Sequence, residues 1–139
     1  MKKLIVSGLL LMSLFVVGGC TDSADLSLAD VRTCLAPGQS GCGAEQTVFG
    51  RDAEEIFVTA VLNDAAPGTK VDFAWKFVDG SQDIDTVTLT ADQAGASNLE
   101  ASLPKPTFEG GWPAGDYEVR IKVQNHPEVK TTIKDFSIQ

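Results

Sequence analysis

Two segments of the chain, residues 70–78 and 117–124, place a large apolar side chain at every second position. These positions are Val71, Phe73, Trp75 and Phe77 in KVDFAWKFV, and Tyr117, Val119, Ile121 and Val123 in YEVRIKVQ. Successive side chains of a β-strand point to opposite faces, so a period of two gives each segment one apolar and one polar face. The chain is therefore constrained to bury one face of a β-sheet.

Five further segments between residues 45 and 139 have strand character. EIFVTAVL is apolar on both faces, which predicts a central or doubly covered strand. A short opening strand is expected near QTVF, and others at IDTVTLT and NLEASL. The last strand starts with Val129, Thr131 and Ile133, after which the apolar phase moves to Phe136 and Ile138, as a β-bulge would produce. Turn-rich links and no helical period between strands predict one all-β sandwich of seven strands.

Two aromatic residues mark positions that are typical of a known fold. Trp75 lies on the third expected strand and Tyr117 opens the sixth. The stretch GWPAGDYEV resembles the Trp-Pro-x-Gly-x-Tyr-x-Val segment of immunoglobulin-like domains in bacterial cell-surface and periplasmic proteins. This resemblance implies an immunoglobulin-like or fibronectin III-like sandwich over residues 45–139, with Trp75 buried and Tyr117 in a tyrosine corner. The second and sixth strands hold no cysteines, so the inter-sheet disulfide common in that fold is not expected.

The first residues have the features of a secretory signal peptide. Lys2 and Lys3 precede an apolar run over residues 4–17, and Gly18 and Gly19 follow. As a helix, this run would span roughly 21 Å, which is short of the ~30 Å hydrocarbon core of a bilayer. Ordinary cleavage that releases a soluble protein and an uncleaved membrane helix stay open as alternatives.

The end of this segment resembles the lipobox of bacterial lipoproteins, in which small residues precede a cysteine. Cys20 stands at that position. The resemblance implies a signal peptide over residues 1–19, a diacylglycerol on the Cys20 sulfur and acyl chains such as palmitate at the new N-terminus. Two or three acyl chains give stable anchoring. Because Thr21 and not Asp follows the cysteine, the resemblance favours the outer membrane of the cell envelope over the inner membrane.

The chain contains three cysteines, and lipid on Cys20 would leave Cys34 and Cys42 as one pair. The bacterial envelope outside the inner membrane is oxidising, so a disulfide can persist there. The intervening residues include Pro37 and two glycines, which suit a tight loop. Residues 20–44 are accordingly expected to hold the lipidated cysteine, a tether and a disulfide loop. Two thiols without a neighbouring histidine make half a metal site, so no metal is predicted here.

Acidic residues dominate the charge. After loss of the two signal-peptide lysines, nine basic residues would face nineteen acidic ones. Such a balance argues against a nucleic-acid partner and against electrostatic attraction to anionic lipid. The expected membrane contact is therefore the N-terminal lipid.

No catalytic motif stands out, and neither an enzyme activity nor a cofactor is predicted. His126 is the single histidine and precedes Pro127 in an expected turn. Asp79, Asp83 and Asp85 lie close together in DGSQDID, and hard cations such as Ca²⁺ take carboxylate oxygens. Their spacing departs from the EF-hand pattern, so a polar hairpin loop is the favoured interpretation and calcium binding stays open.

The loop over residues 104–115, PKPTFEGGWPAG, carries the candidate binding residues Phe108 and Trp112. Aromatic rings on a stiff loop can stack on sugars or anchor a partner protein. The alternative is that Trp112 folds back as a lid over the end of the sandwich. An open sheet edge is a second candidate surface. The sequence thus predicts a non-catalytic binding or accessory module for an envelope protein partner, with carbohydrate or cell-wall recognition as the alternative.

Overall fold

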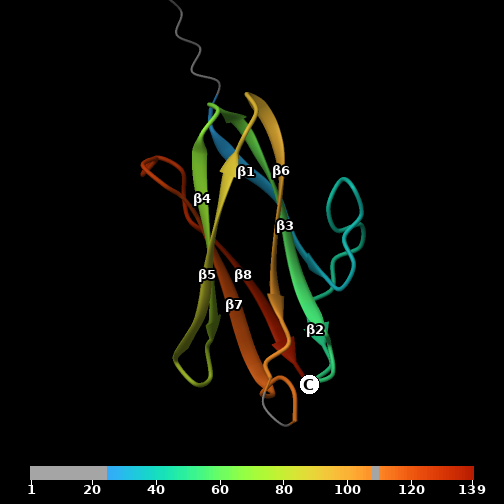
Figure 1. The fold of residues 1–139 in the computed structure, drawn as a ribbon. Coiled ribbons are helices and arrows are strands. Elements are labelled where there is room, and N and C mark those ends of the chain that lie inside the picture. Colours follow the sequence, from blue (N-terminus) through green and yellow to red (C-terminus); the bar gives the residue numbers. More distant parts are fainter. Residues whose placement is uncertain (1–24, 108–109) are drawn as a thin grey trace, which may run out of the picture.

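The computed structural model describes residues 25–107 and 110–139, and these form a two-layer β-sandwich (Figure 1). The strands are β1 (Ser27–Cys34), β2 (Val48–Phe49), β3 (Glu55–Ala65), β4 (Thr69–Phe77), β5 (Gln82–Ala91), β6 (Gly95–Pro104), β7 (Gly115–Val123) and β8 (Thr132–Ile138). One sheet has the order β1-β3-β6 and the other β2-β8-β7-β4-β5. Every pair is antiparallel except β2 with β8. Cys20 and Phe108 lie outside the described residues.

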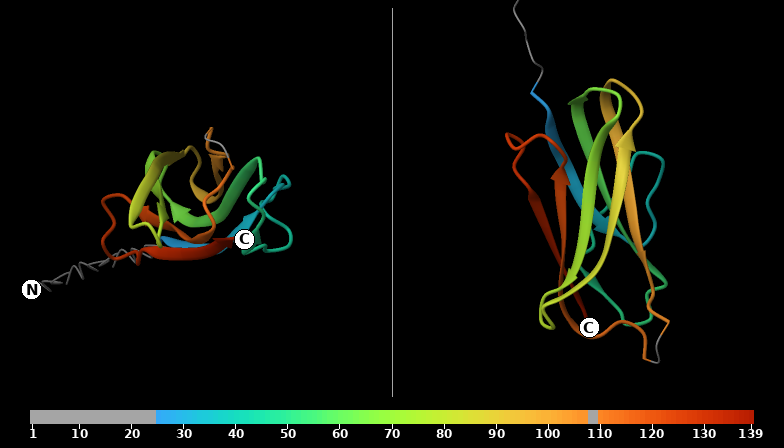
Figure 2. Two further views of the ribbon diagram at one scale, coloured as in Figure 1. Left: turned by 90° about the horizontal axis from the view of Figure 1, so that it is seen from below. Right: turned by 60° about the vertical axis from the view of Figure 1, so that its left-hand side comes forward.

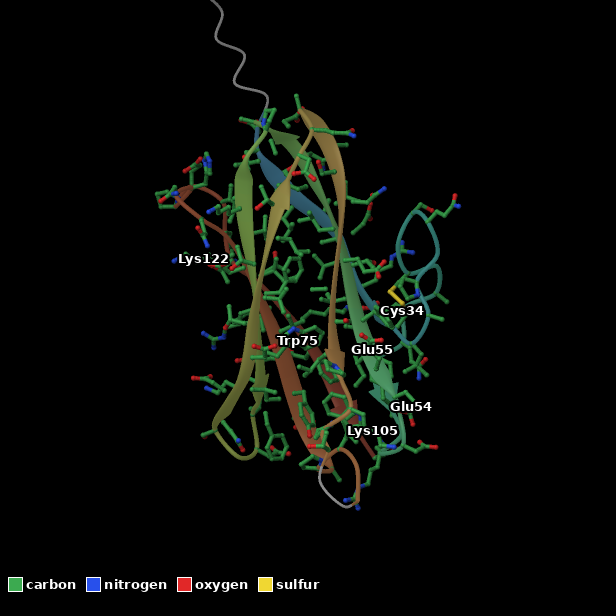
Figure 3. All side chains as sticks on the ribbon, in the orientation of Figure 1. Cys34, Glu54, Glu55, Trp75, Lys105 and Lys122 are labelled. Atoms are coloured by element: carbon green, nitrogen blue, oxygen red, sulfur yellow. A yellow bond between two sulfur atoms is a disulfide. The ribbon has the colours of Figure 1, made fainter. Side chains whose placement is uncertain are left out.

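Figure 2 shows the two sheets facing each other, and the buried core residues lie between them. The alternating residues of β4 and β7 point inward and pack against β3, β6 and β8. Trp75 lies at the centre of the sandwich (Figure 3), where its ring meets Phe136 edge to face at 6.0 Å. The expected all-β sandwich and the burial of Trp75 are confirmed. The part of the chain that the structure describes contains no helix long and apolar enough to cross a membrane.

Strand β3 is the central strand of its sheet, as its two apolar faces predict. Its inner face enters the core, while the outer face is partly covered by the loop that the Cys34–Cys42 disulfide closes (Figure 3). The backbone N–H of Cys42 donates a 2.9 Å hydrogen bond to the buried Thr59 hydroxyl of β3. The disulfide loop therefore packs on the outer face of β3, and the hydrogen bond to Thr59 holds it there in addition to the disulfide.

The expected tether differs from the structure in part, because residues 27–34 form β1. This strand pairs with β3, with Leu28 opposite Leu62, and raises the number of strands from the seven expected to eight. The register shifts between Ala29 and Arg32, where Asp30 has a positive φ of 50°. This β-bulge moves the apolar phase by one residue within the strand, so no period of two is visible in the sequence.

The prediction of a β-bulge in the last strand is wrong. Strand β8 pairs with β7 in unbroken register, and its inward positions are Thr132, Lys134, Phe136 and Ile138. Ile133 points outward and is 48% exposed. The apolar pattern misled because Lys134 occupies an inward position at the side of the sheet, where its ammonium pairs with Glu45. Inward-pointing charges near an edge discourage pairing with other chains.

Strand β5 shows the same device at the opposite edge of this sheet. Asp85 lies opposite Trp75 in register, so it occupies an inner-face position on a strand with no neighbour on its other side. The position is solvent-exposed because β5 separates from β6 toward the lower end of the sandwich (Figure 1). An aliphatic residue there would complete the apolar face, but it would make the edge strand more prone to pair with other chains.

Candidate functional site

Tyr117 at the start of β7 organises the lower end of the sandwich. Its hydroxyl donates a 2.6 Å hydrogen bond to the carbonyl of Pro113, four residues upstream, which is the tyrosine corner that the sequence predicts. The side chain is 2% exposed, and its ring stacks on Phe136 at 5.3 Å. Burial raises the pKa of this phenol, the charge of Arg51 opposes that shift, and Asp79 adds to it.

Trp112 is folded into the protein, with 1% of its surface exposed. Its indole N–H donates to the Ala53 carbonyl at 2.7 Å, and its ring meets Tyr117 edge to face at 6.1 Å. The backbone N–H of Trp112 donates to the Arg51 carbonyl, while the Arg51 side chain donates back to the Trp112 carbonyl at 2.9 Å. The lid arrangement is the one found, so the Trp112 ring is not an exposed platform.

The glycines of the 104–115 loop are required by this close docking. Gly111 has a positive φ of 70°, and a Cβ there would lie 2.1 Å from the backbone oxygen of Arg51. At Gly115 a Cβ would lie 2.4 Å from the Asp79 carboxylate, which instead accepts a hydrogen bond from the N–H of Asp116. The loop is therefore fixed at both ends, next to β3 and next to the β4–β5 hairpin.

A recess of about 210 Å³ opens beside this loop, between the start of β5 and the end of β6. We call it the end pocket. Its floor is made by Leu103, Trp112 and Tyr117, its walls by Phe77, Ile84, Pro104, Pro106 and Pro113, and its rim by Gln82 and Asp83. Figures 1 and 2 show that β5 and β6 diverge toward this end of the sandwich, where the recess lies.

The chemistry of the end pocket is divided between an apolar interior and a polar rim. The polar atoms of its two floor aromatics are both occupied, since the indole N–H of Trp112 and the hydroxyl of Tyr117 each donate to a backbone carbonyl. Proline lacks an N–H donor, so the three prolines add C–H surface. The exposed side chains of Gln82 and Asp83 supply amide and carboxylate groups at one side of the opening.

One side of the loop is also tied to the turn before β3. Lys105 donates through its backbone N–H to the Glu54 carbonyl at 2.8 Å, and its ammonium lies 3.3 Å from the Glu54 carboxylate (Figure 3). The carboxylate of Glu54 is largely exposed, so this ion pair adds little stability. Lys105 is not among the residues that line the end pocket.

The structure separates the three carboxylates considered for calcium. Asp79 accepts from the Asp116 N–H, Asp85 accepts from the N–H of Thr86, and Asp83 lies at the rim of the end pocket. Across residues 25–107 and 110–139, no group of three or more His, Cys, Asp or Glu residues is arranged to hold a metal ion. The structure therefore gives no support to a calcium site formed by these carboxylates.

His126 lies in the β7–β8 turn, away from the end pocket. Its Nδ1 lies 2.8 Å from the carboxylate of Glu128. The pKa of Glu128 is lowered, first by a hydrogen bond from its own backbone and then by His126. This pair shapes an exposed turn.

The 104–115 loop contributes residues to the end pocket, but the sequence pattern does not indicate most of the other lining residues. Phe77 and Ile84 were assigned to strands, and nothing in their local pattern indicated a recess. The signal that could have found it is the group of prolines around Trp112, since Pro104, Pro106 and Pro113 all line the same opening.

Comparison with known proteins gives fold likenesses at low identity. No protein-family model matches the chain, and a search of curated proteins found no match. A β-glucuronidase of Parabacteroides merdae aligns over 81% of this chain and 13% of its own, with a TM-score of 0.47 and 13% identity. A β-glucosidase from Listeria innocua, solved with glucose, aligns over 82% of this chain and 16% of its own, with a TM-score of 0.49 and 7% identity.

The C-terminal domain of wzt aligns over 79% of this chain and 78% of its own, with a TM-score of 0.38 and 10% identity. This chain thus spans less than a fifth of either glycosidase. Identities and TM-scores this low carry no functional argument. The class that the strand order and packing define is a single β-sandwich domain with immunoglobulin-like features.

Proposed function

We propose that this protein is a non-catalytic recognition module of the bacterial cell envelope whose end pocket binds carbohydrate. The observation that carries the proposal is the end pocket itself, where an apolar interior stands beside a rim of amide and carboxylate groups. One face of a sugar ring is lined by C–H groups, while its hydroxyls need donors and acceptors at the edge. Binding sites that fix small polar ligands commonly combine an apolar lining with a few placed polar groups.

The pocket is also held in shape before a ligand arrives. Trp112 and Tyr117 are fixed by hydrogen bonds to backbone carbonyls, and the loop between β6 and β7 is docked on the turn before β3. Pre-organisation of this kind lowers the entropy lost on binding. A rigid recess on a sandwich end suits a module that holds one sugar unit of a longer chain.

Lipid on Cys20 would place this module at the membrane surface, with the outer membrane favoured. The test is fractionation of cells that express the full chain. Wild-type protein is expected in the membrane fraction, and a Cys20→Ala variant is expected in the soluble envelope fraction. An unchanged distribution of the variant would argue against the lipid anchor.

A glycan array probed with the full-length protein, purified in detergent, tests carbohydrate binding. We expect a restricted set of positive glycans, and we expect Ile84→Ala to weaken them. The matched control is Ile133→Ala, since Ile133 is an equally simple exposed isoleucine on the outer face of the sandwich. A flat array profile, or an equal effect of both substitutions, would contradict the proposal.

The free edge of β5 supports a second candidate function, recognition of an envelope protein partner. The strand runs over Gln82–Ala91 and pairs on one side with β4, so its other side offers backbone donors and acceptors to an extended segment. In-cell cross-linking followed by mass spectrometry tests this candidate. One dominant partner, cross-linked through β5 and lost with a proline substitution of the exposed Thr88, would favour it over carbohydrate binding.

A further inference from the structure

We infer that the sugar unit taken by the end pocket is neutral and carries an acetamido group, whose methyl reaches the pocket floor while its N–H faces the rim. This inference rests on the proposed function and names the ligand class of the same site. It follows from three properties of the pocket: the absence of a free side-chain donor on its described floor, the position of its rim groups, and the local charge.

The floor of the end pocket accepts an apolar group and disfavours a hydroxyl. Leu103, Trp112 and Tyr117 present carbon surface there, because the indole N–H and the phenol are bonded to the carbonyls of Ala53 and Pro113. A sugar hydroxyl that entered this floor would find no free side-chain donor to replace its hydrogen bonds from water. A methyl group gains free energy in the same position.

The rim lies on one side only. Gln82 and Asp83 are the first two residues of β5, whereas the opposite wall consists of prolines. A carboxylate accepts hydrogen bonds, so Asp83 suits an amide N–H or a pair of neighbouring hydroxyls. An acetamido group joins the two requirements, since its methyl and its N–H are held at a fixed short distance on one planar unit.

The charge around the pocket opposes acidic sugars. Asp79 and Asp85 flank Asp83 in the β4–β5 hairpin, and the whole chain has a formal net charge of −8. Of the nearby cations, Lys105 is paired with Glu54, and the Arg51 side chain is directed to the Trp112 carbonyl. Like charges raise the free energy of an encounter, so uronates and phosphorylated sugars are disfavoured.

The size of the recess limits the ligand to one buried unit. A volume of about 210 Å³ is below the range of a site for a drug-sized molecule, which is about 300–1,000 Å³. The remaining units of a glycan would lie outside the pocket. Affinity for a single unit is accordingly weak, and the discriminating quantity is the ratio between ligands.

The test compares four β-linked oligosaccharides of equal length with the full-length protein in detergent: oligomers of N-acetylglucosamine, glucosamine, glucose and glucuronic acid. Titration calorimetry gives the affinities, and the emission of Trp112, recorded in a Trp75→Phe background, reports whether the pocket is the site. We expect the N-acetylglucosamine oligomer to bind about 10-fold more tightly than the glucose oligomer, from one buried methyl and one carboxylate hydrogen bond. Asp83→Asn is expected to reduce this preference, while Asp92→Asn, in the β5–β6 turn, leaves it unchanged.

The outcomes separate the inference from the proposed function. Equal binding of the acetylated oligomer and the glucose oligomer, or tighter binding of the acidic or amino oligomer, overturns the acetamido inference but leaves carbohydrate binding intact. No binding of any sugar in this set or on the array overturns both. A change in Trp112 emission on addition of an acetylated leucine amide, without binding of the acetylated sugar, would assign the pocket to a peptide side chain and also overturn the inference.

Discussion

Removal of one oxygen atom from Tyr117 tests whether the tyrosine corner holds the lower end of the sandwich together. Tyr117→Phe keeps the ring contacts with Phe136 and deletes the 2.6 Å hydrogen bond to the Pro113 carbonyl. A neutral hydrogen bond contributes about 1 kcal/mol, and this partly buried carbonyl left without a partner adds desolvation cost, so we expect a loss of about 2 kcal/mol in the free energy of unfolding. For a domain of this size, that corresponds to a decrease of roughly 8 °C in Tm.

Urea denaturation followed by tryptophan fluorescence measures this loss, and an unchanged m-value would show that the denatured state is the same. Thr69→Val is the matched control. Thr69 also donates a 2.6 Å hydrogen bond from a hydroxyl to a backbone carbonyl, but that bond is exposed, so water replaces it and we expect less than about 0.5 kcal/mol. Equal effects of the two substitutions would refute the argument that burial sets the value of the corner.

The raised pKa of Tyr117 predicts that the free energy of unfolding decreases at alkaline pH. Tyr117 is the only tyrosine of the chain, so absorbance of the phenolate reports on it alone. Burial raises its pKa above 10.0, so the folded protein holds this proton more tightly than the unfolded chain. Its contribution to stability is therefore complete below pH 10.0 and is lost as the pH rises through the folded pKa. Titration of the native phenol at or below 10.0 would contradict this, and Tyr117→Phe should flatten the pH dependence.

Three further predictions concern the disulfide loop, the edge strand β5 and the register of β8. Replacing Cys34 and Cys42 together by serine removes a short closed loop and should destabilise by about 2.5 kcal/mol in urea, whereas reducing agent should then have no further effect. Asp85→Val should increase self-association in light scattering without loss of stability, and Thr86→Val on the outer face of the same strand should not; equal association would reject the edge-protection argument. Ile133→Ala should change the free energy of unfolding by less than about 0.5 kcal/mol, and a loss above about 2 kcal/mol would restore the bulged register expected from the sequence.

The end pocket could be predicted only in part. The 104–115 loop was found because prolines and aromatic residues are concentrated there. Its partners could not be found, since Phe77, Ile84 and Leu103 belong to three different strands whose local patterns show ordinary sheet positions. The recess exists because β5 and β6 diverge at one end, and no short segment encodes the distance between two sheets.

The sequence by itself determined that β4 and β7 are strands and which of their faces are buried, because alternation along a strand is a local property of the backbone. The resemblance of GWPAGDYEV to immunoglobulin-like domains also predicted the tyrosine corner, whose two residues, Tyr117 and Pro113, are only four positions apart. Only the tertiary structure decided that residues 27–34 join the sandwich and that Lys134 points inward. It also decided that Trp112 lies in the floor of the end pocket, where hydrogen bonds join it to Arg51 and Ala53, about sixty positions earlier. These features depend on contacts between distant segments, whose free energy is gained only when the two sheets pack.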